Sequence, residues 1–158
     1  MQNNDIQTNK SWKQDVYNAY FTTVVDKIKR LQHNLAELKE SGSNETKSTA
    51  GDKHETALAM LQIEQAKNRE QLLIAQQQQE ALQRTKNMVN PAKIINGSLV
   101  KTSLGHFYIC TALGKAVVAN VVVQAISAQS PLGNILIGLS VQQSFTINNS
   151  HGIIEAIE

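Results

Sequence analysis

The sequence predicts an α+β protein: a long antiparallel α-helical coiled-coil hairpin followed by a small antiparallel β domain with one short helix. Two observations predict this class. Residues 1–92 hold twelve Lys or Arg and eleven Asp or Glu, so the rest of the chain carries very few charges. In residues 1–92 apolar residues recur at steps of three and four, and in the rest of the chain they recur at every second position. The two parts meet near Asn90-Pro91.

Composition excludes several classes of protein. At 158 residues the chain suits one or two small domains. The single cysteine, Cys110, cannot form an intramolecular disulfide, and we interpret it as buried packing in a strand. No apolar run approaches the roughly 20 residues of a membrane span, and the first ten residues lack a signal-peptide core. We therefore expect a soluble, cytoplasmic protein with no membrane contact.

The first expected helix covers residues 11–41, after a polar and flexible N-terminus at residues 1–10. Its apolar residues follow one another at steps of four and three, the period of an amphipathic helix with a narrow seam. These residues are Trp12, Val16, Tyr20, Val24, Ile28, Leu31, Leu35 and Leu38. The helix should end at Ser41-Gly42, where glycine interrupts the pattern.

The second expected helix covers residues 52–87. Its seam holds Leu58, Leu61, Leu72, Ala75 and Leu82, but also Gln65, Asn68 and Gln79, so we expect the seam to be weakest in its middle. The short polar linker leaves only an antiparallel arrangement. Residues 11–92 should thus form a hairpin with its tip near residues 42–55, where the leucines of the first helix meet Leu58 and Leu61.

Residues 93–158 read as a small antiparallel sheet. Strands are expected over 98–102, 106–111, 115–118, 121–127, 142–147 and 152–157. Asn148-Asn149-Ser150 should form the turn of the final pair. Pro131 should lie near the first position of a short helix over residues 131–137.

Asp52 and Glu55 are the candidate site residues. Their spacing of three places both on one face of a helix, at the end of a long rod. Carboxylate oxygens are ligands that Mg²⁺ prefers. Asp followed by Glu three residues later also resembles a capping box, which starts a helix without any chemistry. Both interpretations stay open, and one residue can serve both.

Two further groups lie on the expected hairpin. Lys27, Lys29 and Arg30 form a basic cluster that is suited to RNA phosphates, or equally to a solvated helix face beside Asp26. His54 lies between the two candidate carboxylates and is interpreted as a solvated residue at the helix start.

Two motifs resemble those of the bacterial Gre transcript-cleavage factors. The stretch Gly51-Asp52-Lys53-His54-Glu55-Thr56-Ala57 is similar to the family's tip motif, Gly-Asp-Leu-x-Glu-Asn-Ala. Residues 126–138, ISAQSPLGNILIG, are similar to its C-terminal signature, Ile-Ser-x-x-Ser-Pro-Leu-Ala-x-x-Leu-Leu-Gly. The resemblance is closest to the small Gre-like proteins of Bacteroidetes-type bacteria. The chain departs from the family at residues 56–59, Thr-Ala-Leu-Ala in place of Asn-Ala-Glu-Tyr, and at Leu139 in place of Lys.

The resemblance implies an FKBP-like fold for residues 93–158 and a role as a transcription elongation factor. Such a factor binds RNA polymerase and inserts its coiled-coil tip through the secondary channel. It is not an enzyme itself but stimulates the polymerase's own cleavage of backtracked RNA. It has no cofactor of its own: Asp52 and Glu55 would act as catalytic and metal-binding residues toward an Mg²⁺ ion shared with the polymerase active site.

The resemblance also implies a contact with the 3′ end of the nascent RNA, no direct DNA contact, and a monomer. Two alternatives remain. One is a regulator that occupies the secondary channel without promoting cleavage, which the departures after the tip motif suggest. The other is a coiled-coil scaffold unrelated to polymerase.

Overall fold

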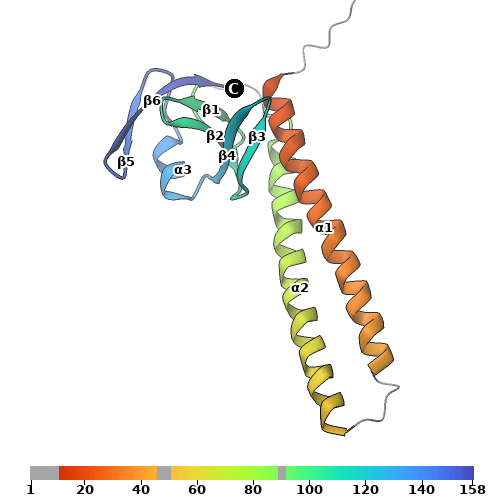
Figure 1. Cartoon of the computed structure of the whole chain (residues 1–158). Helices are drawn as coiled ribbons and strands as arrows, with labels where there is room; N and C mark the ends of the chain where they lie inside the picture. Colours follow the sequence, from red (N-terminus) through yellow and green to blue (C-terminus); the bar gives the residue numbers. More distant parts are fainter. Residues whose placement is uncertain (1–10, 46–50, 89–91) are drawn as a thin grey trace, which may run out of the picture. The chain divides into compact units, whose positions relative to one another are not determined.

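Two long helices precede a six-stranded sheet in the computed structural model, which describes residues 11–45, 51–88 and 92–158 (Figure 1). The helices are α1 (Trp12–Glu45) and α2 (Gly51–Thr85). The chain divides into two compact units: a hairpin unit, Thr22–Glu80, and a sheet unit that joins Met1–Phe21 to Ala81–Glu158. Residues 93–158 thus share a unit with the ends of both helices. No helix within the described residues is both long and apolar enough to cross a bilayer.

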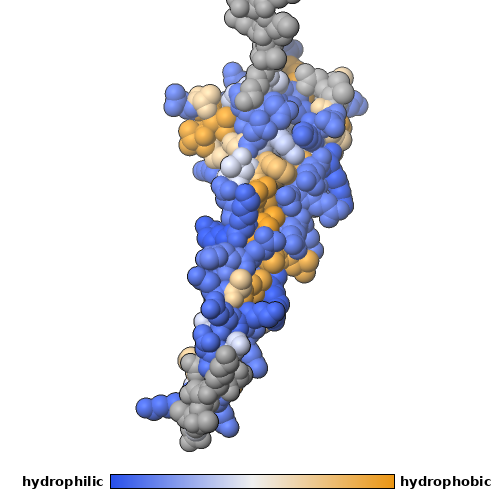
Figure 2. Space-filling view, turned by 90° about the vertical axis from the view of Figure 1, so that its right-hand side faces the viewer, coloured by the Kyte–Doolittle hydropathy of each residue, from blue (hydrophilic) through white to orange (hydrophobic). Residues whose placement is uncertain are grey.

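In the hairpin unit the two helices run antiparallel and pack against each other, as the sequence predicts (Figure 1). Val24, Ile28 and Leu31 of α1 and Ala75 of α2 are buried in the seam. Figure 2 shows apolar side chains gathered in a strip along the helices, between hydrophilic flanks. Burial of the seam residues stabilises the pair, because most of the stability of helices in proteins comes from packing of an apolar face.

The expected end of the first helix was wrong, since α1 continues through Gly42 to Glu45. A glycine inside a helix costs about 1 kcal/mol relative to alanine but does not interrupt the hydrogen bonds. The Gln65 Nε2 donates to the carbonyl oxygen of Leu38 at 3.3 Å and lies 3.8 Å from the place of a Cβ at Gly42. Leu38 is therefore opposite Gln65 rather than Leu58 and Leu61, because the longer α1 shifts the pairing.

The middle of the seam is polar, as expected, and its polar groups are satisfied locally. Asn68 is only 6% exposed, and its Nδ2 donates to the Glu64 carbonyl oxygen at 2.9 Å and to Glu64 Oε1 at 3.1 Å. A hollow of about 280 Å³ opens beside it. The hollow is lined by Asn34, Glu37, Leu38, Ser41, Glu64 and Asn68. This part of the seam therefore contributes less apolar burial than the Val24–Leu31 part.

The strands fall close to their predicted positions. They are β1 (Leu99–Thr102), β2 (Gly105–Cys110), β3 (Gly114–Val118), β4 (Val121–Ser127), β5 (Ser144–Ile147) and β6 (Ser150–Ile157), in the spatial order β3-β4-β2-β1-β6-β5. Asn148 and Asn149 have φ of 47° and 65°, so the last hairpin turns on two left-handed residues, as a type I′ turn requires.

The expectation of a wholly antiparallel sheet was wrong: β2 and β4 pair in parallel, while the other pairs are antiparallel. The tight turn at Ala119 and Asn120 folds β4 back between β3 and β2. The composition of the two strands explains this order. β4 carries the buried Val123, Ala125 and Ile126, whereas most of β3 is exposed. The more apolar strand therefore takes the central position and β3 becomes the edge.

One face of the sheet carries the core around α3 (Pro131–Leu136). This core holds Ile94, Val100, Phe107, Ile109, Ile126, Leu136, Phe145 and Ile154. Phe145 lies over Gly152 on the neighbouring strand, where a Cβ would come within 2.4 Å of its ring. The aromatic ring thus occupies the space that the glycine leaves, and the β5–β6 hairpin closes the core.

The opposite face is covered by the ends of α1 and α2 that belong to the sheet unit. The Tyr20 hydroxyl lies 2.8 Å from the Gly114 carbonyl oxygen and 2.7 Å from that of Val123, and accepts a hydrogen bond from the Ala125 N–H at 3.1 Å. From α2, the Thr85 and Tyr108 hydroxyls share a buried hydrogen bond of 2.8 Å. These bonds attach both helix ends to β4 and β2.

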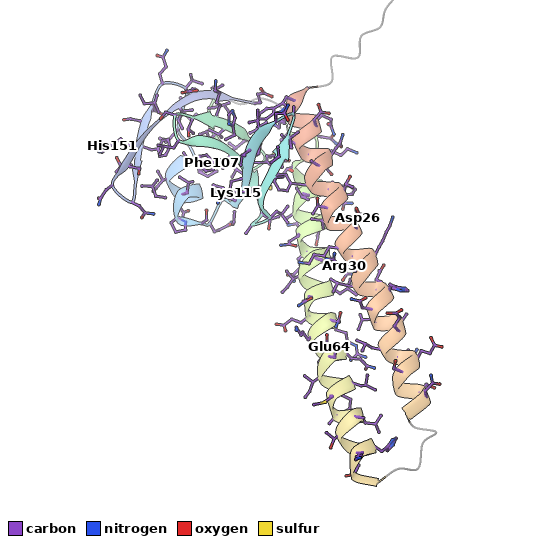
Figure 3. The ribbon with its side chains drawn as sticks, in the orientation of Figure 1. Asp26, Arg30, Glu64, Phe107, Lys115 and His151 are labelled. Atoms are coloured by element: carbon purple, nitrogen blue, oxygen red, sulfur yellow. The ribbon has the colours of Figure 1, made fainter. Side chains whose placement is uncertain are left out.

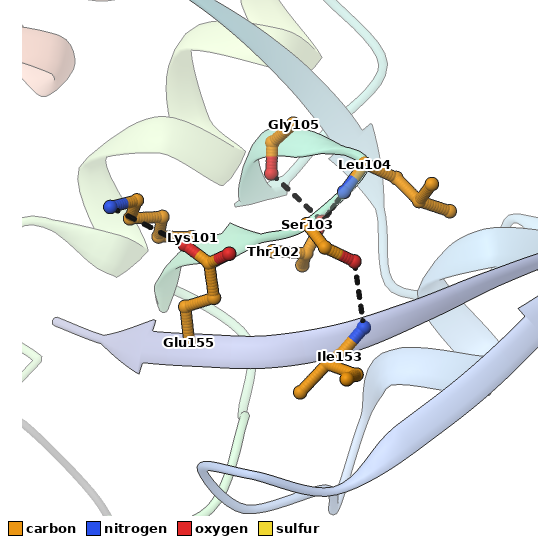
Figure 4. A network of polar contacts seen from close by, with 7 residues as sticks. All are labelled: Lys101, Thr102, Ser103, Leu104, Gly105, Ile153 and Glu155. Carbon is orange, nitrogen blue, oxygen red and sulfur yellow. Dashed lines mark hydrogen bonds and ion pairs between the residues drawn. The ribbon is translucent and has the colours of Figure 1, made fainter.

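A bulge between β1 and β6 is held by a small polar network (Figure 4). Thr102 Oγ1 accepts from the Leu104 N–H and donates to the Gly105 carbonyl oxygen, which closes the β1–β2 turn. The Ile153 N–H donates to Ser103 Oγ at 3.0 Å. Lys101 pairs with Glu155 across the bulge at 3.3 Å, an exposed pair that contributes little to stability.

The short helix α3 begins as its sequence predicts. Ser130 is the N-cap, its Oγ accepts from the Gly133 N–H at 3.0 Å, and Pro131 occupies the first turn. Gly133 lies so close to the end of β4 that a Cβ would meet the Ser127 carbonyl oxygen at 2.1 Å. Only glycine permits this approach.

We expect Tyr20→Phe to lower the free energy of unfolding by about 1–3 kcal/mol, because backbone groups of β3 and β4 lose a buried partner. Urea denaturation followed by circular dichroism measures this change. Tyr17→Phe is the matched control, since Tyr17 is also a buried residue but its hydroxyl forms no hydrogen bond with the described residues. Equal effects of the two substitutions would contradict the assignment.

Gly133→Ala should destabilise the sheet unit by about 1–3 kcal/mol, the range of overpacked cores, because the β4 backbone cannot give way as a flexible side chain could. The measurement is the thermal midpoint by calorimetry. Gly114→Ala serves to separate backbone strain from crowding, since Gly114 has a φ of 74° and nothing within 4 Å of a Cβ. If Gly133→Ala left the midpoint unchanged, the close approach would be wrong.

Stability should fall at alkaline pH. Burial raises the pKa of Tyr20 from 10.0 to about 12 and that of Cys110 from 9.0 to about 12. Because the folded state holds these protons more tightly, their contribution is complete below the unfolded pKa values and is lost as pH rises toward the folded ones. The urea midpoint should drop between about pH 9 and pH 12, and less so in Tyr20→Phe. A urea midpoint that does not change over this pH range would contradict the burial of Tyr20 and Cys110.

Candidate functional site

The two candidate carboxylates lie in the first turns of α2. The helix begins at Gly51, so Asp52 is its second residue and Glu55 its fifth. Asp52 is therefore inside the helix and not the N-cap that the capping-box interpretation requires. Glu55 is exposed. As the fifth residue, Glu55 lies just beyond the first turn, where the free N–H groups of a helix end favour carboxylates most.

Positions 52 and 55 are one helical turn apart, which is the arrangement that the sequence predicts. Among the side chains that the structure describes, which do not include that of Asp52, no three His, Cys, Asp or Glu residues come together as a group that could hold a metal ion. Mg²⁺ demands near-octahedral oxygen ligation, often with one or two protein carboxylates beside waters and phosphates. The donor chemistry of this pair therefore fits an Mg²⁺ ion whose remaining ligands come from water or another molecule.

An apolar hollow of about 390 Å³ lies beside the pair and was not predicted. It is lined by Lys53, Thr56, Ala57 and Met60, and Met60 is 67% exposed. The spacing of these positions, i, i+3, i+4 and i+7, is that of one helix face and could have revealed it. The start of α2 thus has a shallow, open hollow on one face, with Ala57 and Met60 as its apolar members.

The basic cluster lies far from the acidic pair. Lys29 and Arg30 are exposed and Lys27 is half-buried; Figure 3 shows Arg30 on α1, one turn from Asp26. Because Leu38 is opposite Gln65, the cluster is level with residues 73–76 of α2, roughly 30 Å along the helix from Glu55. The structure therefore does not bring the cluster and the carboxylates into one site.

The aromatic residues of residues 93–158 do not gather in one pocket. Phe107 and Phe145 belong to the core on one face of the sheet, and Tyr108 bonds Thr85 on the other. A hollow of about 200 Å³ is lined by Phe107, His106 and non-aromatic residues. Lys115, on the edge strand β3, is one of these lining residues (Figure 3). An aromatic-lined proline pocket is not formed by these described residues.

The cysteine lies where the sequence predicts. Cys110 is on β2 and buried, and burial raises the pKa of its thiol to about 12. A thiol with so high a pKa stays protonated at neutral pH and is a poor nucleophile.

Comparisons with known proteins do not identify a family. No protein-family model matches the sequence, and no curated protein matches it significantly.

Proposed function

We propose that this protein binds RNA polymerase and stimulates the polymerase's own cleavage of backtracked RNA, with the start of α2 as the part that enters the secondary channel. The observation that carries the proposal is the position of Asp52 and Glu55, one turn apart at the end of a 35-residue helix. The tip and C-terminal motifs add the resemblance to Gre factors. The proposal also includes a cytoplasmic location.

The geometry supports delivery of carboxylates into a narrow site. Asp52 lies about 50 Å along α2 from Thr85, where the helix is attached to the sheet through Tyr108. We infer that the start of the hairpin unit, where α2 is paired with α1, is the part that reaches into the channel. The sheet unit would then supply contacts to the polymerase at the entrance.

The chemistry would be shared between the two proteins. When bound, a second Mg²⁺ supplies activation of the attacking water in a two-metal cleavage of a phosphodiester. In this chain, the carboxylates at positions 52 and 55 would help to hold and orient that ion near the 3′ end of the RNA. The protein alone has no turnover in this proposal, because its own donors do not close a site.

The decisive variant is Asp52→Asn with Glu55→Gln. We expect transcript cleavage to fall by about 100-fold or more, since even groups that only orient metal ligands contribute roughly 10–100-fold. Polymerase affinity should stay nearly constant, because the amides preserve shape. The measurement is RNA cleavage in a purified backtracked complex, beside a competition-binding assay.

The matched control is Glu37→Gln with Glu40→Gln, an exposed pair with the same spacing on α1. It removes the same two charges away from the tip and should leave cleavage intact. Full cleavage by the tip variant would remove the metal role. If the unmodified protein bound polymerase but did not promote cleavage, a regulator that occupies the channel without cleavage would be favoured. The sequence Thr56-Ala57-Leu58-Ala59, which departs from the family's Asn-Ala-Glu-Tyr, supports that alternative. Absence of binding would favour the scaffold.

A further inference from the structure

The helix α2 carries a second apolar stripe on the side that faces solvent. Ile63 is 69% exposed and Ile74 44%, with Met60 and Leu73 exposed beside them. The hairpin seam uses other positions of the same helix, among them the buried Asn68 and Ala75. Exposed isoleucines that recur on one helix face, here with Lys67 and Glu70 between them, form a candidate interaction surface.

The centre of this stripe is palindromic. Ile63, Lys67, Glu70 and Ile74 follow at steps of four, three and four, so they share one face of the helix, and all four are exposed. Reading the stripe backwards exchanges one isoleucine for the other and the lysine for the glutamate. The stripe is therefore complementary to itself when two copies run in opposite directions.

We propose that α2 pairs with the α2 of a second copy of this chain, antiparallel, about a two-fold axis between Lys67 and Glu70. Each Ile63 then packs on Ile74 of the other copy, and each Lys67 meets Glu70 of the other copy. A two-fold contact uses the same patch on both copies, so each pairing occurs twice. The two hairpins together form a four-helix arrangement, in place of the monomer expected from the sequence.

The charges of Lys67 and Glu70 favour a second copy of α2 as the partner, and they favour the antiparallel orientation. A parallel pair would place Lys67 against Lys67 and Glu70 against Glu70, which is unfavourable. A purely apolar partner would take Lys67 and Glu70 out of water without offering either of them a charged group, at a cost in desolvation. Only a partner with the inverse order of charges satisfies both, and this chain itself has that order.

Charge reversal tests the pairing in full-length protein by sedimentation velocity over a range of concentrations. Lys67→Glu alone and Glu70→Lys alone should each weaken self-association about tenfold, since two exposed pairs change from attraction to repulsion. Mixing the two variants should restore association, because each copy then meets the opposite charge. The double variant Lys67→Glu/Glu70→Lys should associate like the original. Recovery on mixing cannot arise from an effect within one helix.

The matched control is Lys29→Glu, an exposed charge on α1, which should leave association unchanged. Orientation is tested by a disulfide between Ile63→Cys and Ile74→Cys variants in a Cys110→Ser background, oxidised as a mixture. A dominant 63–74 cross-link supports the antiparallel pair, whereas a dominant 63–63 cross-link overturns it. A monomer at every concentration, or single variants that associate as well as the original, would also overturn it. None of these measurements involves polymerase, so their outcome is independent of the proposed function.

Discussion

The Tyr20 hydroxyl is the contact on which the sheet unit depends. It bonds backbone groups of Gly114, Val123 and Ala125, and its ring lies 6.2 Å from that of Tyr108, which in turn bonds Thr85. Buried backbone groups cost free energy when they lack a partner, so this face of β4 requires the helix end that covers it.

This arrangement separates the stable and the reactive ends of α2. At Thr85 the helix is buried and hydrogen-bonded, whereas Glu55 near its start is exposed. Buried polar groups with full partners give a unique arrangement, and an exposed carboxylate is accessible to other molecules. The division suits a protein whose sheet unit holds the helix while the distant helix start supplies the chemistry that we propose.

The stretch of α2 that is polar toward α1 is the same stretch that carries exposed isoleucines on another side. Gln65 and Asn68 weaken the contact of α2 with α1, while Ile63 and Ile74 give the same stretch apolar surface on another side. Because α2 has apolar residues on two sides, its apolar and polar faces are less clearly separated than those of α1. Covering the second side with another copy would bury apolar area where the hairpin itself buries least.

Local pattern determined most of the elements, and the tertiary structure decided how they combine. The periods of three, four and two predicted α1, α2 and the strands, and Pro131 and Asn148-Asn149 marked the short helix and the last turn, because these signals depend only on neighbouring residues. The positions of Asp52 and Glu55 on one helix followed in the same way. The parallel pairing of β2 with β4 did not, because strand order depends on which strand can bury both faces at once. The continuation of α1 through Gly42, the close approach at Gly133 and the exposure of Ile63 and Ile74 were also decided in three dimensions, because each depends on what packs against the residue from a distant part of the chain.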